Sequence, residues 1–333
     1  MRVVLYSHKM PVDELMVVPV NWEWKILRWP FKKLWTQGAL ALELIKNPPD
    51  VFFSPGQLLP WHVPKKAAVF LHDSAFLFFK DAYNFWGRKY LRLINWWIIK
   101  KANLVITSTE FNHSELARFY GAAVSKKIRV VPLAYNKEKY NEDVVPFTAV
   151  ELADDFGIKK PFALFIGRLE EKKNVRRLVQ AFNSARARND FQLVLSGRPG
   201  CGFSEIEKEI ALSPFKEDIL VLGWVETQDL PRLLRSARVL AFPSSYEGFG
   251  LPVLKAFGCQ VPVLASDIQA LREVGGEAVF FVDQSNIEAM GIGLGHIMSN
   301  EQARENLVNK GQTRVLAFSW GKTAAEIAKM LLF

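Results

Sequence analysis

The sequence predicts an α/β protein made of two Rossmann-like, doubly wound domains, and three observations support this. Short apolar runs alternate with amphipathic helical patterns along most of the chain, which is typical of parallel sheets covered by helices. The chain has 333 residues, of which 50% are hydrophobic, so it can fill two cores. A polar stretch at residues 136–150 divides the runs into two series and predicts a linker.

The first series of runs lies within residues 1–150 and predicts the first domain. Its predicted strands are short, apolar and bounded by polar or turn-forming residues: Val3–Tyr6, Val51–Phe53, Ala67–Leu71, Leu104–Ile106 and Ile128–Val131. Helical patterns separate them at Phe31–Lys46, Asn84–Lys101 and Glu110–Tyr120.

The second series begins at Phe162 and predicts strands joined by helical crossovers. The segment Asn174–Ala187 carries its apolar residues on one helix face, as expected for a helix that packs on a sheet. Ligands of such sheets bind beyond the carboxyl ends of the strands, so the loops after the strands are the first candidates for a site. The predicted strands are Phe162–Ile166, Phe191–Leu195, Ile219–Leu222, Val239–Phe242, Val261–Ala265 and Ala278–Val282.

The loop after the strand Val239–Phe242 has the features of an anion-binding site. Gly248 and Gly250 allow a tight turn and a close approach of the backbone to a ligand. Pro252 suits the first turn of a helix, so the preceding N–H groups are expected at a helix N-terminus, where phosphate binds favourably. Those groups belong to Phe249, Gly250 and Leu251, and the carboxylate of Glu247 comes just before them.

A basic loop follows the first strand of the same series. Gly167 ends the strand, and Arg168 and Lys173 come after it. Arg168 offers a permanently charged, bidentate contact and Lys173 a mobile point charge, and both suit a diphosphate. A pattern of this kind on its own is more often a solvated basic turn, but its combination with the Glu247 loop favours a binding site.

Both loops resemble signature motifs of the family 4 glycosyltransferases. The clearest stretches are FALFIGRLEEKKNVRRLVQAF at Phe162–Phe182 and PSSYEGFGLPVLKAFGCQVPV at Pro243–Val263. The resemblance continues through LVLSGRPG, LGWVETQDLPRLLRSARV, ALREVGGEA and FSWGKTAAEI. In the first half of the chain it is patchier and is carried by PDVFFSPG, AAVFLHDSAF, ANLVITSTEFN and IRVVPLAYN.

The resemblance implies the GT-B architecture, in which two Rossmann-like domains face a cleft. It implies an acceptor-side domain at residues 1–150, a donor-binding domain at 151–321, and a last helix at 322–333 that crosses back to the first domain. The implied reaction is a retaining transfer of a mannose- or glucose-type hexose from a GDP- or UDP-linked sugar to a hydroxyl group of a glycan or lipid-linked acceptor. No metal or other cofactor is expected, because no Asp-x-Asp pair follows a predicted strand.

Roles for single residues also follow from the resemblance. Arg168 and Lys173 would hold the donor phosphates, and Glu247 would orient the sugar and support positive charge at the anomeric carbon. His72 would face the sugar across the cleft, with Asp73 as its orienting partner. The predicted catalytic residues are thus Glu247 and His72. The predicted donor-binding residues are Gly167, Arg168, Lys173, Gly197, Val225, Gly248, Phe249, Gly250, Leu251 and Lys255, of which Gly197 and Val225 would meet the ribose and the base through their backbones.

The chain departs from the family pattern in two places. The family usually has a second glutamate eight residues after the first, which binds the ribose hydroxyls, and here this position is Lys255. A lysine has no acceptor oxygen, so it would instead add to the field at the phosphates. The family also opens with a glycine-rich loop, whereas this chain has no glycine before Gly38, and its first strand resembles a later strand of the domain. These departures keep open an alternative: a degenerate member that binds nucleotide, another anionic ligand or a protein partner without turnover.

Charge and cysteine usage limit the other function classes. The formal net charge of +9 favours an anionic partner, but no nucleic-acid-binding motif accompanies it, so nucleic acid is not expected. Cys201 and Cys259 are far apart in the sequence and are expected to be reduced thiols of a cytoplasmic protein. Neither a signal peptide nor a transmembrane run is recognised.

Two segments mix aromatic residues with cations, and two interpretations stay open for them. Such a mixture suits peripheral binding to an anionic membrane, here its inner surface. Alternatively, the tryptophans are buried and the cations surround them at the rim of the core. The first segment contains Trp22, Trp24, Lys25, Arg28, Trp29, Phe31, Lys32, Lys33, Leu34 and Trp35, and the second contains Trp86, Arg88, Lys89, Tyr90, Arg92, Trp96 and Trp97.

Overall fold

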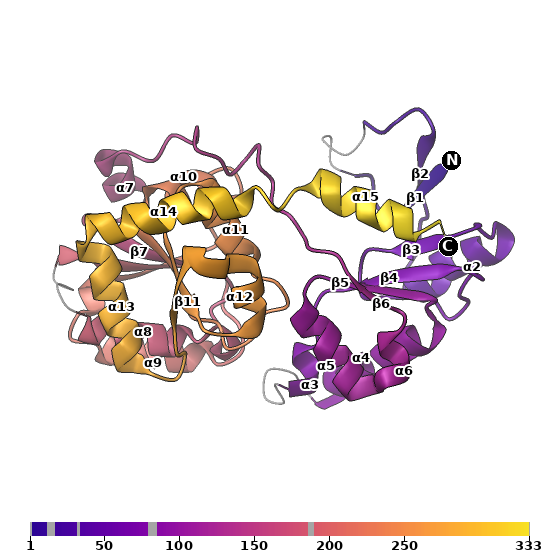
Figure 1. The fold of residues 1–333 in the computed structure, drawn as a ribbon, viewed down its shortest axis with the longest axis horizontal. Coiled ribbons are helices and arrows are strands. Elements are labelled where there is room, and N and C mark those ends of the chain that lie inside the picture. The colour runs from indigo at the N-terminus through magenta and orange to yellow at the C-terminus, as the bar shows by residue number, and fades with distance from the viewer. Residues whose placement is uncertain (1, 12–16, 32–33, 79–84, 186–189, 333) are drawn as a thin grey trace.

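A computed structural model shows two α/β bodies joined by two crossings of the chain (Figure 1). It describes all residues except 1, 12–16, 32–33, 79–84, 186–189 and 333. The second body, residues 149–315, contains a six-stranded parallel sheet, and the first contains a four-stranded parallel sheet and a separate two-stranded one. The α/β class and the parallel sheets predicted from the sequence are therefore confirmed.

The six-stranded sheet has the strand order of a dinucleotide-binding fold. Its spatial order is β9-β8-β7-β10-β11-β12, so the direction of winding reverses between β7 and β10. Ligands of such sheets bind at this reversal, beyond the carboxyl ends of the two strands. The strands are β7 (Phe162–Ile166), β8 (Gln192–Ser196), β9 (Ile219–Gly223), β10 (Val239–Phe242), β11 (Val263–Ser266) and β12 (Val279–Val282), each within two residues of its predicted bounds.

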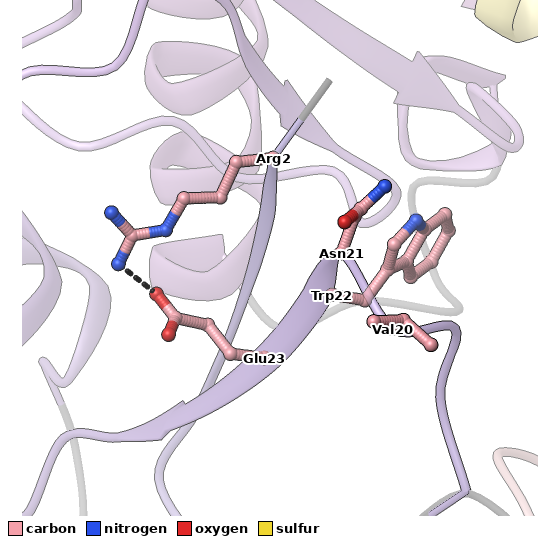
Figure 2. A pocket seen from close by; sticks show the side chains of 5 residues that line it. All are labelled: Arg2, Val20, Asn21, Trp22 and Glu23. Atoms are coloured by element: carbon pink, nitrogen blue, oxygen red, sulfur yellow. Dashed lines mark hydrogen bonds and ion pairs between the residues drawn. The ribbon is translucent and has the colours of Figure 1, made fainter.

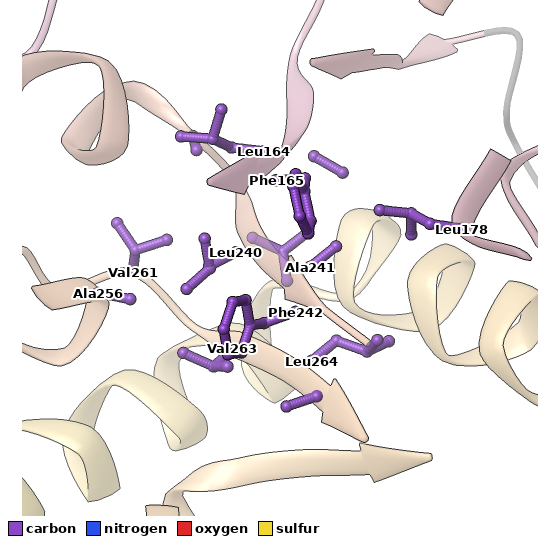
Figure 3. Packing of buried hydrophobic residues seen from close by; sticks show 14 of the residues in the cluster. Leu164, Phe165, Leu178, Leu240, Ala241, Phe242, Ala256, Val261, Val263 and Leu264 are labelled. Atoms are coloured by element: carbon purple, nitrogen blue, oxygen red, sulfur yellow. The ribbon is translucent and has the colours of Figure 1, made fainter. Parts of the chain in front are cut away.

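Helices cover both faces of this sheet, and its core is continuous (Figures 1 and 3). Figure 3 shows Leu164, Leu240 and Val263, from three adjacent strands, packed into one apolar layer. Phe165 and Phe242 stack with ring centroids 6.5 Å apart. The helical elements are α7 (Ala149–Phe156), η2 (Glu171–Lys173), α8 (Val175–Ser184), α9 (Phe203–Leu212), η4 (Lys216–Asp218), α10 (Leu230–Ser236), α11 (Leu251–Gly258), α12 (Gln269–Gly275), η5 (Gly276–Ala278), α13 (Ile287–Ser299) and α14 (Glu301–Val315).

The four-stranded sheet has its strands in sequential order, β3-β4-β5-β6. Strand β4 is buried along its whole length, as expected for an inner parallel strand. Figure 1 shows α3 to α6 on one side of the sheet and α15 on the other. These elements are β3 (Phe52–Ser54), β4 (Ala67–Leu71), β5 (Leu104–Thr107), β6 (Ile128–Val130), η1 (Thr36–Leu40), α2 (Ala41–Lys46), α3 (Ala75–Phe78), α4 (Phe85–Lys101), α5 (Glu110–Tyr120), α6 (Ala122–Ser125) and α15 (Trp320–Met330).

The start of the chain differs from its prediction. Among the described residues, strand β1 (Val3–Ser7) pairs in parallel only with β2 (Trp22–Ile26), a strand that the sequence analysis did not predict. The helix expected from Phe31 begins only at Thr36. Leu34 has φ of 66°, which a helix does not allow, and the indole N–H of Trp35 donates to the carbonyl of Leu27 at 2.8 Å. Lys32 and Lys33 lie outside the described residues.

The last helix, α15, packs on the first body (Figure 1). Its residues Ile327 and Met330 contact the cluster that contains Phe70 and Val131, on the sheet face opposite α4. The hydroxyl of Thr323 donates to the carbonyl of Pro132 at 2.8 Å. No helix in the described part of the chain combines the length and the apolar character needed to cross a bilayer.

Candidate active site

Two loops meet at the point where the strand order reverses. The Gly167 loop follows β7, and the Gly248 loop follows β10. The Ser245 N–H donates to the carbonyl of Lys172 at 2.9 Å, which ties the loops together. Lys173 Nζ lies 2.5 Å from Glu247 Oε1, and the two side chains are only 16% and 12% exposed. The structure therefore places the predicted phosphate-binding lysine against the predicted catalytic carboxylate.

Local backbone geometry directs Lys173 inward. A single 3-10 turn, η2, ends at Asn174, which adopts a left-handed conformation with φ of 60°. Asn174 is buried, and its amide donates to the carbonyl of Gln284 at 2.8 Å, which compensates for the unusual backbone. The ammonium of Lys173 also lies 5.6 Å from the centroid of the Phe242 ring.

The side chain of Arg168, in the Gly167 loop, remains accessible to solvent. It is 67% exposed, and its Nε lies 3.6 Å from a carboxylate oxygen of the buried Glu170. The loop is held against the loop after β8 by close backbone packing, because a Cβ atom on Gly197 would lie 1.7 Å from the carbonyl oxygen of Gly167. Only glycine fits at position 197, so this contact fixes the position of the backbone at Arg168.

Helix α11 begins as the sequence predicts. Gly250 has φ of 100°, and Pro252 occupies the first turn. Within the described part of the chain, no hydrogen bond uses the N–H groups of Phe249, Gly250 or Leu251. The Phe249 side chain is buried and packs against Phe318 with ring centroids 5.9 Å apart. This helix end thus offers unpaired donors next to Glu247.

The Gly248 loop also contacts the first body directly. The Gly248 carbonyl accepts hydrogen bonds from Ser108 Oγ at 3.0 Å, Thr109 Oγ1 at 3.1 Å and Asn112 Nδ2 at 2.8 Å. A Cβ atom on Gly248 would lie 2.2 Å from the carbonyl oxygen of His72. The sequence analysis assigned no role to Ser108, Thr109 or Asn112, although their motif, Ser-Thr-x-x-Asn after a buried strand, stands within ANLVITSTEFN.

A second contact across the bodies uses a helix N-terminus. The carboxylate oxygens of Glu273, on α12, accept hydrogen bonds from the N–H groups of Glu110 and Phe111, both at 2.7 Å. These are orphan donors of the first turn of α5, where a negative charge is favourable. Tyr246 adds a third contact, since its hydroxyl accepts from the N–H of Ser74 at 3.3 Å.

His72 lies where the first body meets the Gly248 loop. Its Nε2 is 2.9 Å from the carbonyl of Pro55, and its ring stacks on Phe70 with centroids 4.7 Å apart. The expectation that Asp73 orients His72 is wrong. The Asp73 carboxylate instead accepts from the N–H of Ala75, the first residue of the short helix α3, at 3.1 Å.

The residues expected at the base and ribose lie at the ends of β8 and β9. The Gly197 N–H donates to the carbonyl of Gly223 at 2.7 Å, and Val225 is buried two residues further on. Trp224 between them is 55% exposed, with the Arg198 guanidinium 4.7 Å from its ring centroid.

Lys255 points toward the linker. Its Nζ lies 4.7 Å from the ring centroid of Tyr140, and burial lowers the pKa of its amino group. Burial also raises the pKa of the neighbouring Cys259 thiol to about 12. The surroundings of Lys255 therefore disfavour a charged amino group, unlike those expected for a group that adds to a phosphate-binding field.

Two surface hollows lie away from these loops. One, of about 380 Å³, is lined by Arg2, Val20, Asn21, Trp22 and Glu23 at the β1–β2 pair, and Figure 2 shows the Arg2–Glu23 ion pair at its edge. The other, of about 770 Å³, is lined by the linker residues Lys139, Val144 and Val145 and by residues 226–228, 231 and 232. Neither is lined by a residue of the Gly167 or Gly248 loops.

Comparisons with known proteins agree with this geometry. Residues 152–314 match the family model described as Glycosyl transferases group 1. The O-antigen chain mannosyltransferase B of Escherichia coli is 28% identical over 277 residues, which are 81% of this chain and 71% of that protein. Two further curated relatives are matched over 66% and 58% of their own lengths.

Solved structures show the same fold at low identity. Sucrose-phosphate synthase from Thermosynechococcus elongatus matches with a TM-score of 0.78 and 19% identity, over 99% of this chain and 88% of that one. Anabaena HepE in complex with UDP and glucose matches with a TM-score of 0.75 and 16% identity, over 99% of both chains. Together with the loops at the strand reversal, these findings show that residues 152–314 form a domain of the group 1 glycosyltransferases and that the chain as a whole has the GT-B fold.

Proposed function

We propose that the protein is a retaining glycosyltransferase that moves a mannose- or glucose-type hexose from a nucleotide diphosphate to a hydroxyl group. The observation that carries the proposal is the Lys173–Glu247 pair at the strand reversal, 2.5 Å apart and flanked by unpaired helix N–H groups. A cation, a carboxylate and free backbone donors at one point are what a diphosphate with an attached sugar requires.

The diphosphate would lie between the Gly167 loop and the start of α11. Arg168 is exposed and can bind one phosphate with two parallel hydrogen bonds. The ammonium of Lys173 carries three N–H groups, so it can bind a phosphate oxygen while it keeps its ion pair with Glu247. The N–H groups of residues 249–251 complete the site from the other side.

The sugar would lie on the side of Glu247 that faces His72. When the bond from the anomeric carbon to the diphosphate breaks, negative charge grows on the leaving oxygen and positive charge on the sugar. Arg168 and Lys173 stabilise the first, and the carboxylate of Glu247 stabilises the second. This scheme takes its positive charge from side chains and needs no resident metal, so turnover is expected to persist in EDTA.

The relatives support the classes of donor and acceptor. One is a mannosyltransferase of O-antigen chains, and one structural neighbour holds UDP and glucose. We therefore assign a GDP- or UDP-linked hexose as donor and a glycan or lipid-linked hydroxyl group as acceptor.

Release of nucleotide from a panel of UDP- and GDP-sugars, with and without glycan acceptors, tests the proposal. Glu247→Gln and Lys173→Ala are expected to lower turnover at least about 100-fold, as for loss of a transition-state contact. Glu171→Gln and Arg176→Ala change exposed residues beside the same loop and serve as matched controls. If the wild-type protein releases no nucleotide from any donor, the turnover claim is wrong.

Lys255 favours a second candidate, a protein that binds nucleotide without turnover. A carboxylate that would accept hydrogen bonds from ribose is absent at this position, and the lysine contacts Tyr140 instead. Calorimetric titration with UDP and GDP separates the candidates, since binding without release supports the second and absence of binding contradicts both.

A further inference from the structure

Helix α4 presents an exposed face that mixes aromatic side chains with cations. Trp86 is 76% exposed, Tyr90 49%, Leu93 53% and Trp96 47%. The spacing of three and four residues places all of them on one side of the helix. The opposite side, with Ile94 and Ile98, is buried against the four-stranded sheet.

The cations of this face lie directly over its aromatic rings. Lys89 Nζ is 5.5 Å from the ring centroid of Trp86, and Lys100 Nζ is 4.8 Å from that of Trp96. The helix sequence FWGRKYLRLINWWIIKK contains Arg88, Lys89, Arg92, Lys100 and Lys101 but no aspartate or glutamate. We define the membrane face as Trp86, Lys89, Tyr90, Leu93, Trp96 and Lys100.

We propose that the membrane face of α4 binds the surface of an anionic lipid bilayer. Indole and phenol rings are favoured at the boundary between headgroups and acyl chains, while the lysines reach the lipid phosphates. Each cation near an anionic surface contributes about a fivefold gain in affinity. The helix lies in the surface and does not cross it.

The structure favours α4 over the other aromatic and basic segment. In residues 22–35, Trp29 packs against Gly38, Trp35 donates its N–H to Leu27, and Lys25 is bound by Glu43 at 2.6 Å. A second copy of this chain is a poor occupant of the membrane face, since the cations of the two helices would repel each other. The inference does not rest on the proposed reaction, because binding to vesicles needs no donor.

Co-sedimentation with vesicles tests the inference on the full chain. Vesicles of phosphatidylcholine mixed with phosphatidylglycerol are compared with vesicles of phosphatidylcholine alone, at low and high salt. The wild-type protein is expected to pellet with the mixed vesicles and to be released by salt. Lys89→Glu/Lys100→Glu should weaken binding about 25-fold or more, and Trp86→Ser/Trp96→Ser should also release the protein.

Matched variants make the test specific. Lys137→Glu/Lys310→Glu makes the same change of charge at exposed lysines elsewhere, and Trp22→Ser removes an exposed tryptophan of the other segment. Both are expected to bind like the wild type, and circular dichroism checks that all variants fold. The inference is overturned if the wild type stays in the supernatant at low salt, binds RNA but no vesicles, or binds both vesicle types equally. Equal binding by the α4 charge variant and its control also overturns it.

Discussion

Asn112 Nδ2 donates to the carbonyl of Gly248 at 2.8 Å, which joins the first body to the loop that carries Glu247. The same amide lies 3.1 Å from the carbonyl of His72, so one side chain holds two of the predicted site segments together. Asn112 is buried, and such a group is costly to remove because its partners lose their hydrogen bonds.

We expect Asn112→Ala to lower kcat/KM for nucleotide release by the equivalent of about 1 to 3 kcal/mol. Asn112→Asp should be worse, because a carboxylate would face the carbonyl oxygens of Gly248 and His72. Ser114→Ala, at an exposed position of the same helix, is the control. Steady-state kinetics of the three variants measures this, and an Asp variant as active as the Ala variant would contradict the geometry.

The carboxylate of Glu273 should stabilise the contact between the bodies. Glu273→Ala removes the acceptor for two N–H groups at the start of α5 and is expected to cost about 0.5 to 2 kcal/mol of stability. The urea unfolding midpoint measures this. Glu277→Ala, at an exposed position nearby, should leave the midpoint unchanged, and equal effects of both changes would argue against the cap.

Restoring a carboxylate at position 255 should strengthen nucleotide binding. Lys255→Glu supplies acceptors for ribose hydroxyls, and one charge-assisted hydrogen bond is worth about 1.5 to 3 kcal/mol. Lys255→Met removes the amino group without adding acceptors, so it separates the two effects. Titration calorimetry with UDP and GDP should show tighter binding for the Glu variant alone, and unchanged affinity would refute the ribose argument.

The cap of α7 should weaken in acid. Hydrogen bonds from Thr148 and Arg232 lower the pKa of the Glu151 carboxyl from 4.5 to about 2. Because the folded state favours the ionised form, this stabilisation is complete above about pH 4.5 and is lost as the pH falls toward about 2. The difference in urea midpoint between wild type and Glu151→Gln should therefore shrink from pH 7 to pH 2.5. The same comparison with the exposed Glu207 should show no such trend.

Elements with a strong local pattern could be predicted from the sequence, and contacts between the bodies could not. The strands β7 to β12 are short apolar runs between turn residues, and these runs predict the strands directly. Strand β2 escaped prediction because its five residues mix two tryptophans with Glu23 and Lys25. Strand β2 begins 15 residues after its partner β1 ends, and pairing between segments this far apart produces no periodic pattern in the sequence.

Some residues of the candidate site could likewise be predicted from the sequence, and others could not. Glu247, Gly248 and Gly250 were predictable because a strand, a glycine turn and a helix start follow one another within a few residues. The partners of Gly248 just before and within α5 are 136 to 140 residues away in sequence, and only the fold brings them near. Asp73 was misassigned for a related reason, since proximity to His72 in sequence did not reveal that its carboxylate binds the N–H of Ala75.

The position of α15 has a consequence for how the protein is made. This helix covers the face of the four-stranded sheet that bears Phe70 and Val131, yet it is translated after that sheet and after the whole second body. During synthesis on the ribosome, that apolar face stays exposed until residues 320–330 have left the exit tunnel. The first body is thus completed only after the second body has been synthesised, and nascent chains stalled before Trp320 should recruit chaperones.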